Sequence, residues 1–146
     1  MQQIAAVEQE FCAAQSASEL FQDETRSNPS YGESRGWNPQ AGAAFVENLE
    51  TTYLIRIYAE FEAGLRDYWR THHRRKSYPK MEQLVRHAIP DQAFSQDIID
   101  AADRVREYRN ILVHGDEDDP PDQILRLTVP DAKKFLCTYF SRLAPW

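Results

Sequence analysis

Residues 43–71 read AAFVENLETTYLIRIYAEFEAGLRDYWRT and form the longest helical pattern in the chain. Apolar side chains recur there at steps of three and four residues, the spacing that places them on one side of an α-helix. The resulting apolar stripe includes Leu54, Ile57, Phe61 and Tyr68. The stretch therefore predicts one long amphipathic helix with a buried face.

Similar patterns precede and follow this stretch. A helix is predicted over 2–24, where the stepping positions are Ile4, Val7, Phe11, Ala14, Ser18 and Phe21. A shorter helix is predicted over 80–87 and a long one over 91–114. Gly115 ends the latter, at the place where a left-handed residue commonly stops a helix.

The last helix is predicted from its capping signal. Thr128 and Asp131 have the spacing of a capping box, and Pro130 stands in the first turn. We expect this helix to run through Leu143. The segment before it, ILRLTV, is strand-like, but one short strand makes no sheet.

Two segments predict loops. Prolines and glycines are frequent between residues 25 and 42, which indicates a mobile loop. Residues 115–123, GDEDDPPDQ, indicate a solvated acidic loop. We therefore expect a single all-α domain over 1–146, an antiparallel bundle of four to five helices.

Composition restricts the class of protein further. The 146 residues include 23 acidic and 17 basic side chains, a net charge of −6 that argues against coating nucleic acid through bulk charge. No apolar run is long enough for a transmembrane helix, and Glu8 and Glu10 stand where a signal peptide needs its apolar core. Cys12 and Cys137 follow no metal-ligand spacing, so we expect reduced thiols and a cytoplasmic location.

One charged residue occupies an apolar position. Arg109 lies within the apolar sector of the helix 91–114, because eleven residues beyond Ile98 is roughly three turns plus 20°. A second charged residue, Glu62, lies at the border of the apolar stripe of 43–71. A buried guanidinium is costly unless an anion meets it, so we predict that Glu62 and Arg109 pair. The alternative is an arginine whose stem packs while its head stays in water.

The pair of Glu62 and Arg109 has a second explanation, which is a binding site, and His114 favours it. This histidine follows Arg109 by five residues, so the two side chains leave a helix about 140° apart. One ligand contacts both only if the last turn unwinds or if a second copy contributes. Asn110 shares a face with His114 and is expected to support it.

The segment Arg109-Asn110-Ile111-Leu112-Val113-His114 resembles the signature of the HEPN superfamily (higher eukaryote and prokaryote nucleotide-binding domains) in its prokaryotic ribonuclease-like branch. AEFEAGLRDYW in the earlier helix and EYRNILVHG in the later one are similar in setting, over about residues 43–143. The resemblance implies a HEPN-like bundle and a homodimer that cleaves RNA without metal or cofactor, as a toxin or a defence or stress effector. Asp116 stands where some relatives have a tyrosine that is modified under antitoxin control.

The resemblance also assigns roles. Arg109 would hold the scissile phosphate and His114 would transfer protons around the attacking 2′-hydroxyl, with Asn110 and Glu62 orienting them. The product would carry a 2′,3′-cyclic phosphate, and an antitoxin or other protein inhibitor would be a partner. Two alternatives are a non-catalytic HEPN-like module that binds nucleotide, RNA or protein, and a plain helical adaptor.

A basic stretch is a second candidate for RNA contact. Its cations are Arg66, Arg70, Arg74, Arg75, Lys76 and Lys80, with aromatic rings between them. In such a track the cations would bind phosphates and the rings would stack on bases. The equal alternative is a solvated helix end, where cations interact favourably with the helix dipole. No metal site is predicted, since His72 and His73 diverge on a helix and the acidic loop lacks EF-hand spacing.

Overall fold

The computed structural model describes residues 1–36, 38–73, 79–88, 95–115 and 126–143, and these residues contain six helices and no strand. The helices are α1 (Gln2–Ser27), α2 (Pro29–Ser34), α3 (Pro39–His73), α4 (Met81–His87), α5 (Gln96–His114) and α6 (Val129–Ser141). The predicted all-α class is confirmed. None of the helices in the described part is long and apolar enough to cross a bilayer.

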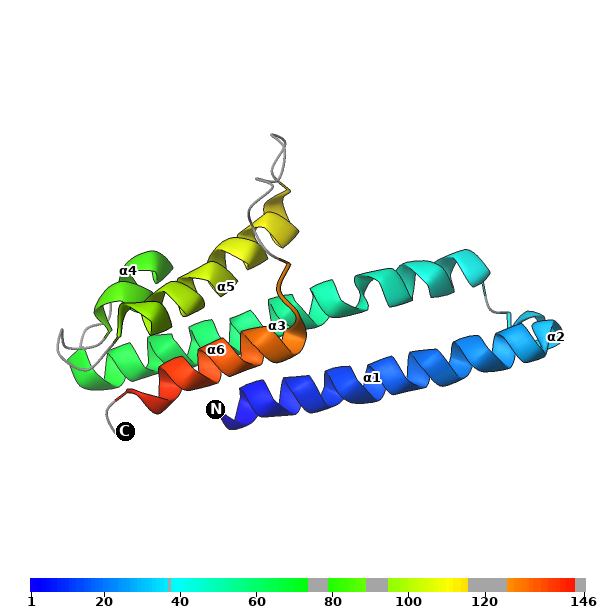
Figure 1. Cartoon of the computed structure of the whole chain (residues 1–146), viewed down its shortest axis with the longest axis horizontal. Helices are drawn as coiled ribbons and strands as arrows, with labels where there is room; N and C mark the ends of the chain where they lie inside the picture. The colour runs from blue at the N-terminus through cyan, green and yellow to red at the C-terminus, as the bar shows by residue number, and fades with distance from the viewer. Residues whose placement is uncertain (37, 74–78, 89–94, 116–125, 144–146) are drawn as a thin grey trace.

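The long helix α3 is the centre of the bundle. It packs against α1, α4, α5 and α6, and the four longer helices alternate in direction along the chain (Figure 1). The N-terminal part of α3 extends beside α1. Together these two helices form an arm of the molecule, with α2 at its tip (Figure 1). The bundle is therefore built around the stretch that has the strongest helical pattern in the sequence.

One hydrophobic core joins these helices. Its members on α3 include Leu54, Ile57, Phe61 and Leu65, all at most 3% exposed. The Phe61 ring meets two aromatic rings of α6, Tyr139 at 5.3 Å and Phe140 at 5.0 Å between centroids. The predicted stripe of α3 is thus the buried one.

The contact between α3 and α6 is close because of one glycine. A Cβ at Gly64 would lie 2.9 Å from Cζ of Phe140, nearer than such atoms normally approach. The absent side chain lets the Phe140 ring rest directly on the α3 backbone.

Two expectations about element boundaries need correction: the last helix ends at Ser141 rather than Leu143, and the segment 25–42 is not a loop. Most of the segment 25–42, expected to be a loop, is helical: α1 continues to Ser27, α2 occupies Pro29–Ser34, and α3 begins at Pro39. The predicted start of α5 at residue 91 lies outside the described residues, and so does the acidic loop beyond Gly115. In the described end of the strand-like segment, residues 126–128 have no regular structure and Val129 begins α6.

Candidate functional site

Helix α5 carries the predicted motif at an end that leaves the bundle. Its first half is buried at Ala102 and Val105, whereas Val113 is 43% exposed and His114 is exposed. Figure 1 shows the C-terminal end of α5 inclined away from α3. Gly115 ends the helix at a φ of 59°, and its N–H bonds to the carbonyl of Ile111. The motif therefore lies on a regular helix that projects from the core.

Arg109 is half-buried on the side of α5 that faces α3. Its guanidinium carbon lies 5.9 Å from the ring centroid of Tyr58, a buried residue of α3. Its Nη1 donates to Oδ1 of Asn110 over 3.1 Å. Among the described residues, no carboxylate forms an ion pair with Arg109. The inward direction of this arginine agrees with the helical pattern, but its expected partner is not there.

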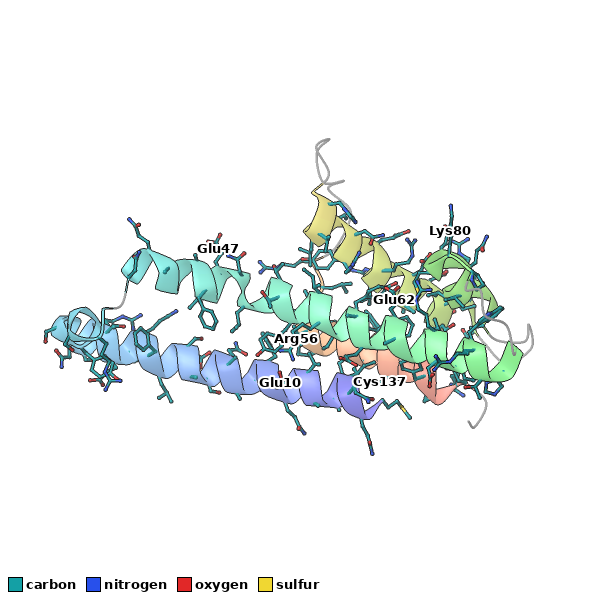
Figure 2. The ribbon with its side chains drawn as sticks, turned by 180° about the vertical axis from the view of Figure 1, so that it is seen from behind. Glu10, Glu47, Arg56, Glu62, Lys80 and Cys137 are labelled. Atoms are coloured by element: carbon teal, nitrogen blue, oxygen red, sulfur yellow. The ribbon has the colours of Figure 1, made fainter. Side chains whose placement is uncertain are left out.

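Glu62 pairs with Arg66 instead, so the predicted Glu62–Arg109 ion pair is wrong. Arg66 lies one turn further along α3 and donates through Nε at 2.9 Å and Nη2 at 2.7 Å, both to Oε1 of Glu62. About a third of each side chain is exposed. Figure 2 shows Glu62 on the half of α3 that α4 and α5 flank. Glu62 pairs with Arg66 rather than Arg109 because residues four apart on one helix lie next to each other, whereas a pair with Arg109 also depends on how α5 packs.

His114 and Asn110 do not meet as expected. Asn110 contacts Arg109, as described above, and within the described part of the chain no hydrogen bond orients the His114 ring. Because α5 stays helical through His114, the last turn does not unwind to bring the two motif ends together. In one chain the Arg109 and His114 side chains therefore point in different directions.

A buried ion cluster behind the motif was missed at the sequence level. Asp103 lies outside the apolar sector of the helical pattern but is only 8% exposed. Its Oδ1 accepts from Nε of Arg106 at 2.5 Å, and its Oδ2 accepts from Nη2 of Arg86 on α4 at 3.1 Å. Burial alone would lower the pKa of Arg106, but the hydrogen bond and charge of Asp103 outweigh it and raise that pKa. The spacing of three residues between Asp103 and Arg106 was the available signal for their ion pair. The contact of Asp103 with Arg86 depends on how α4 packs against α5, which this spacing does not show.

Tyr58 is the second residue that sequence reasoning missed. It is 2% exposed, and its hydroxyl has no hydrogen-bond partner among the described residues. Burial, and then the negative charge of Glu62, raise the pKa of this phenol, while Arg106 and Arg109 act in the opposite direction. The hydroxyl is therefore neutral and lies within the electrostatic reach of these charged groups. Apolar periodicity explains Tyr58 as a core residue and gives no sign of the unpaired hydroxyl.

The structure describes only part of the basic stretch between Arg66 and Lys80. Arg66 is bonded to Glu62, and Arg70 forms an ion pair with Asp67 three residues before it. His72 stacks on Tyr68 with ring centroids 4.0 Å apart. Arg74, Arg75 and Lys76 lie outside the described residues. The two described arginines thus already have carboxylates beside them, which reduces the charge they offer to a phosphate backbone.

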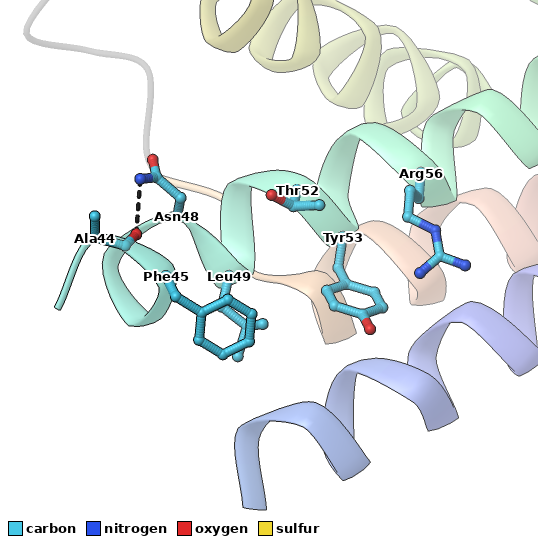
Figure 3. A pocket seen from close by; sticks show the side chains of 7 residues that line it. All are labelled: Ala44, Phe45, Asn48, Leu49, Thr52, Tyr53 and Arg56. Carbon is cyan, nitrogen blue, oxygen red and sulfur yellow. Dashed lines mark hydrogen bonds between the residues drawn. The ribbon is translucent and has the colours of Figure 1, made fainter. Parts of the chain in front are cut away.

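A pocket of about 450 Å³ lies apart from the motif, on the arm side of α3. It is lined by Ala44, Phe45, Asn48, Leu49, Thr52, Tyr53 and Arg56 (Figure 3). Arg56 is already held by Glu10 of α1 at 2.6 Å, and Asn48 donates to the Ala44 carbonyl at 2.8 Å. No candidate catalytic residue lines this pocket, so we place the functional site at Arg109 instead.

The chemistry of the site is that of an anion-binding arginine. A guanidinium with several N–H groups in a partly desolvated position binds carboxylate or phosphate oxygens in pairs. Among the described residues, no group of three or more His, Cys, Asp or Glu is placed to hold a metal ion. Comparison with known proteins finds no match to a protein-family model, a curated protein or a solved structure.

Proposed function

We propose that this chain is a metal-independent endoribonuclease of HEPN type that acts as a homodimer. The observation that carries the proposal is Arg109, a half-buried residue whose guanidinium lies over the Tyr58 ring and has no carboxylate partner among the described residues. A partly buried cation without a counterion is costly in an isolated chain, and a phosphate group supplies the missing charge. The loss of the expected Glu62 pair therefore favours a binding role for Arg109 over a structural one.

The reaction we propose is transesterification within the RNA strand. The 2′-oxygen attacks the adjacent phosphorus, the bond from phosphorus to the 5′-oxygen breaks, and a 2′,3′-cyclic phosphate and a 5′-hydroxyl result. Arg109 stabilises charge on the non-bridging oxygens. The imidazole of His114 accepts the proton of the 2′-hydroxyl and returns one to the 5′-oxygen.

A second copy of the chain is part of the proposal. Arg109 and His114 diverge on one continuous α5, so a cleft that holds both has to take them from two protomers. The exposed end of α5, with Val113 and His114, is a surface that a second copy can reach. We further propose RNA and an antitoxin or other protein inhibitor as partners, and a toxin or defence effector as the cellular role. The motif resemblance supports that part of the proposal.

Cleavage of RNA in EDTA tests this function. We expect the parent protein to cut, and Arg109→Ala and His114→Ala each to reduce the rate by about 100-fold or more. Arg104→Ala is the matched control, because it removes an arginine from α5 about 140° away from Arg109. Circular dichroism verifies that each variant is folded. Undiminished cleavage by folded His114→Ala contradicts the mechanism.

The second candidate is a non-catalytic module that binds RNA or nucleotide at the same arginine. The observation that favours it is the exposed His114 ring, which no hydrogen bond among the described residues orients. RNA binding that depends on Arg109, with no cleavage by any form, would select this candidate.

A further inference from the structure

The buried hydroxyl of Tyr58 is the unexplained polar group next to the proposed site. The residue is 2% exposed, and no described residue bonds to its oxygen. A buried hydroxyl without a partner destabilises a folded chain, and phenylalanine would fill the same space without that cost. Tyr139, another buried tyrosine, offers a contrast, because its hydroxyl donates to the Val85 carbonyl over 2.8 Å.

The groups around Tyr58 have unused hydrogen-bonding capacity that matches it. Glu62, one turn further along α3, accepts both Arg66 bonds on Oε1, while among the described residues Oε2 accepts none. Arg109 lies over the Tyr58 ring and, within the same described part, bonds only to Asn110. A neutral phenol both donates and accepts, so Tyr58 is able to connect a carboxylate with a guanidinium.

We propose that Tyr58 is a positioning residue that links Glu62 to Arg109 when a phosphate occupies the site. In the occupied site an Arg109 N–H donates to the Tyr58 oxygen, and the Tyr58 hydroxyl donates to Oε2 of Glu62. Glu62 then orients Arg109 through Tyr58 rather than by direct contact. The inference rests on the proposed function to the extent that it uses the same phosphate site.

This arrangement explains why an unsatisfied hydroxyl is present in the unoccupied chain. Its cost is relieved only when the guanidinium turns to bind phosphate, so the hydrogen bond contributes to binding and not to folding. Removing the hydroxyl is therefore expected to weaken RNA binding without lowering stability. A core tyrosine with a purely structural role would not separate the two effects.

Tyr58→Phe and Tyr139→Phe form the matched pair of variants that tests the link. Each loses one buried hydroxyl, and thermal unfolding and the affinity for a fully 2′-O-methylated RNA oligonucleotide are measured for both. The methyl groups block the attacking oxygens, so affinity is measured without cleavage. We expect Tyr58→Phe to melt at or above the parent temperature and to bind roughly three- to tenfold more weakly. Tyr139→Phe is expected to melt lower and to bind like the parent.

A double-mutant cycle shows whether Tyr58 acts through Arg109. In the Arg109→Ala background, Tyr58→Phe is expected to cause no further loss of affinity. An equal loss in both backgrounds, or unchanged affinity of Tyr58→Phe, overturns the link. If the parent binds but does not cleave RNA, the nuclease function fails while the link is still judged by affinity. A parent that does not bind the oligonucleotide overturns both.

Discussion

At the scale of single residues, Asp103 stabilises the helix that carries the site. Its side chain is 11% exposed and binds Arg106 and Arg86, which joins α5 to α4. We expect Asp103→Asn to lower the free energy of unfolding by about 2 kcal/mol, because Arg106, whose side chain is 17% exposed, would keep its charge with only the exposed carboxylate of Glu107 beside it.

Urea denaturation of the parent and two variants measures this difference. Asp100→Asn is the control, since Asp100 is exposed on the same helix and its expected effect is within about 0.5 kcal/mol. Equal effects of the two substitutions would contradict a special role for Asp103.

The sequence predicted the direction of Arg109 but not its neighbours. Eleven residues from Ile98 is enough to place a side chain on a helix face. The choice of partner depends on competition, and Glu62 had an arginine one turn away on its own helix. The burial of Asp103 is a related case: a helical pattern shows which face is apolar, whereas the contact with Arg86 of the neighbouring α4 is a tertiary effect.

At the scale of elements, the N-terminus of α6 is held by a capping box. The backbone N–H of Asp131 donates to Oγ1 of Thr128 at 3.2 Å, and the Thr128 hydroxyl donates to Oδ2 of Asp131 at 2.7 Å. The hydrogen bond from Thr128 is the main reason why the pKa of Asp131 is lowered. A lowered folded pKa means that the ionised carboxylate stabilises the fold above its unfolded pKa, and that this stabilisation is lost as pH falls through the folded value.

Asp131→Asn is therefore expected to be pH-dependent in its effect. At about pH 6 the variant should unfold more easily than the parent by less than about 1 kcal/mol, because Asp131 is only partly buried and water screens its charge. Near pH 3 the difference should shrink, since this stabilisation declines once the pH falls below the unfolded carboxylate pKa of about 3.9. Urea denaturation of both proteins at the two pH values measures it. The same difference at both values would contradict the capping role.

Helices were predicted well where apolar periodicity was strong and poorly where proline was read as a breaker. In the segment 25–42, Pro29 and Pro39 each open a helix, which is a position that proline favours because the first turn needs no N–H there. The Asn38 carboxamide accepts from the backbone N–H of Gln40 at 2.9 Å and supports the start of α3. An asparagine followed by proline was the available signal for a helix start, and the frequent glycines outweighed it.

At the scale of the whole molecule, the bundle leaves the two motif ends in different environments. Arg109 lies between α5 and α3, over the Tyr58 ring, whereas His114 stands at the free end of α5. The net charge of −6 does not oppose a site of this kind, because the positive charge of Arg109 acts locally and is partly shielded from solvent. A second copy that approaches the end of α5 would bring its own His114 toward the first copy's Arg109.

Mixing two inactive variants tests this composite arrangement. Homodimers of Arg109→Ala lack the arginine and homodimers of His114→Ala lack the histidine, so neither should cleave RNA. After subunit exchange, a mixed dimer keeps one Arg109 and one His114 on different protomers. If the two residues act across a two-fold interface, equal amounts should restore roughly a quarter of the parent activity, because half of the dimers are mixed and each keeps one of two pairs. Cleavage assays with and without exchange measure the gain, and two variants that stay inactive when mixed would show that both residues are required within one chain.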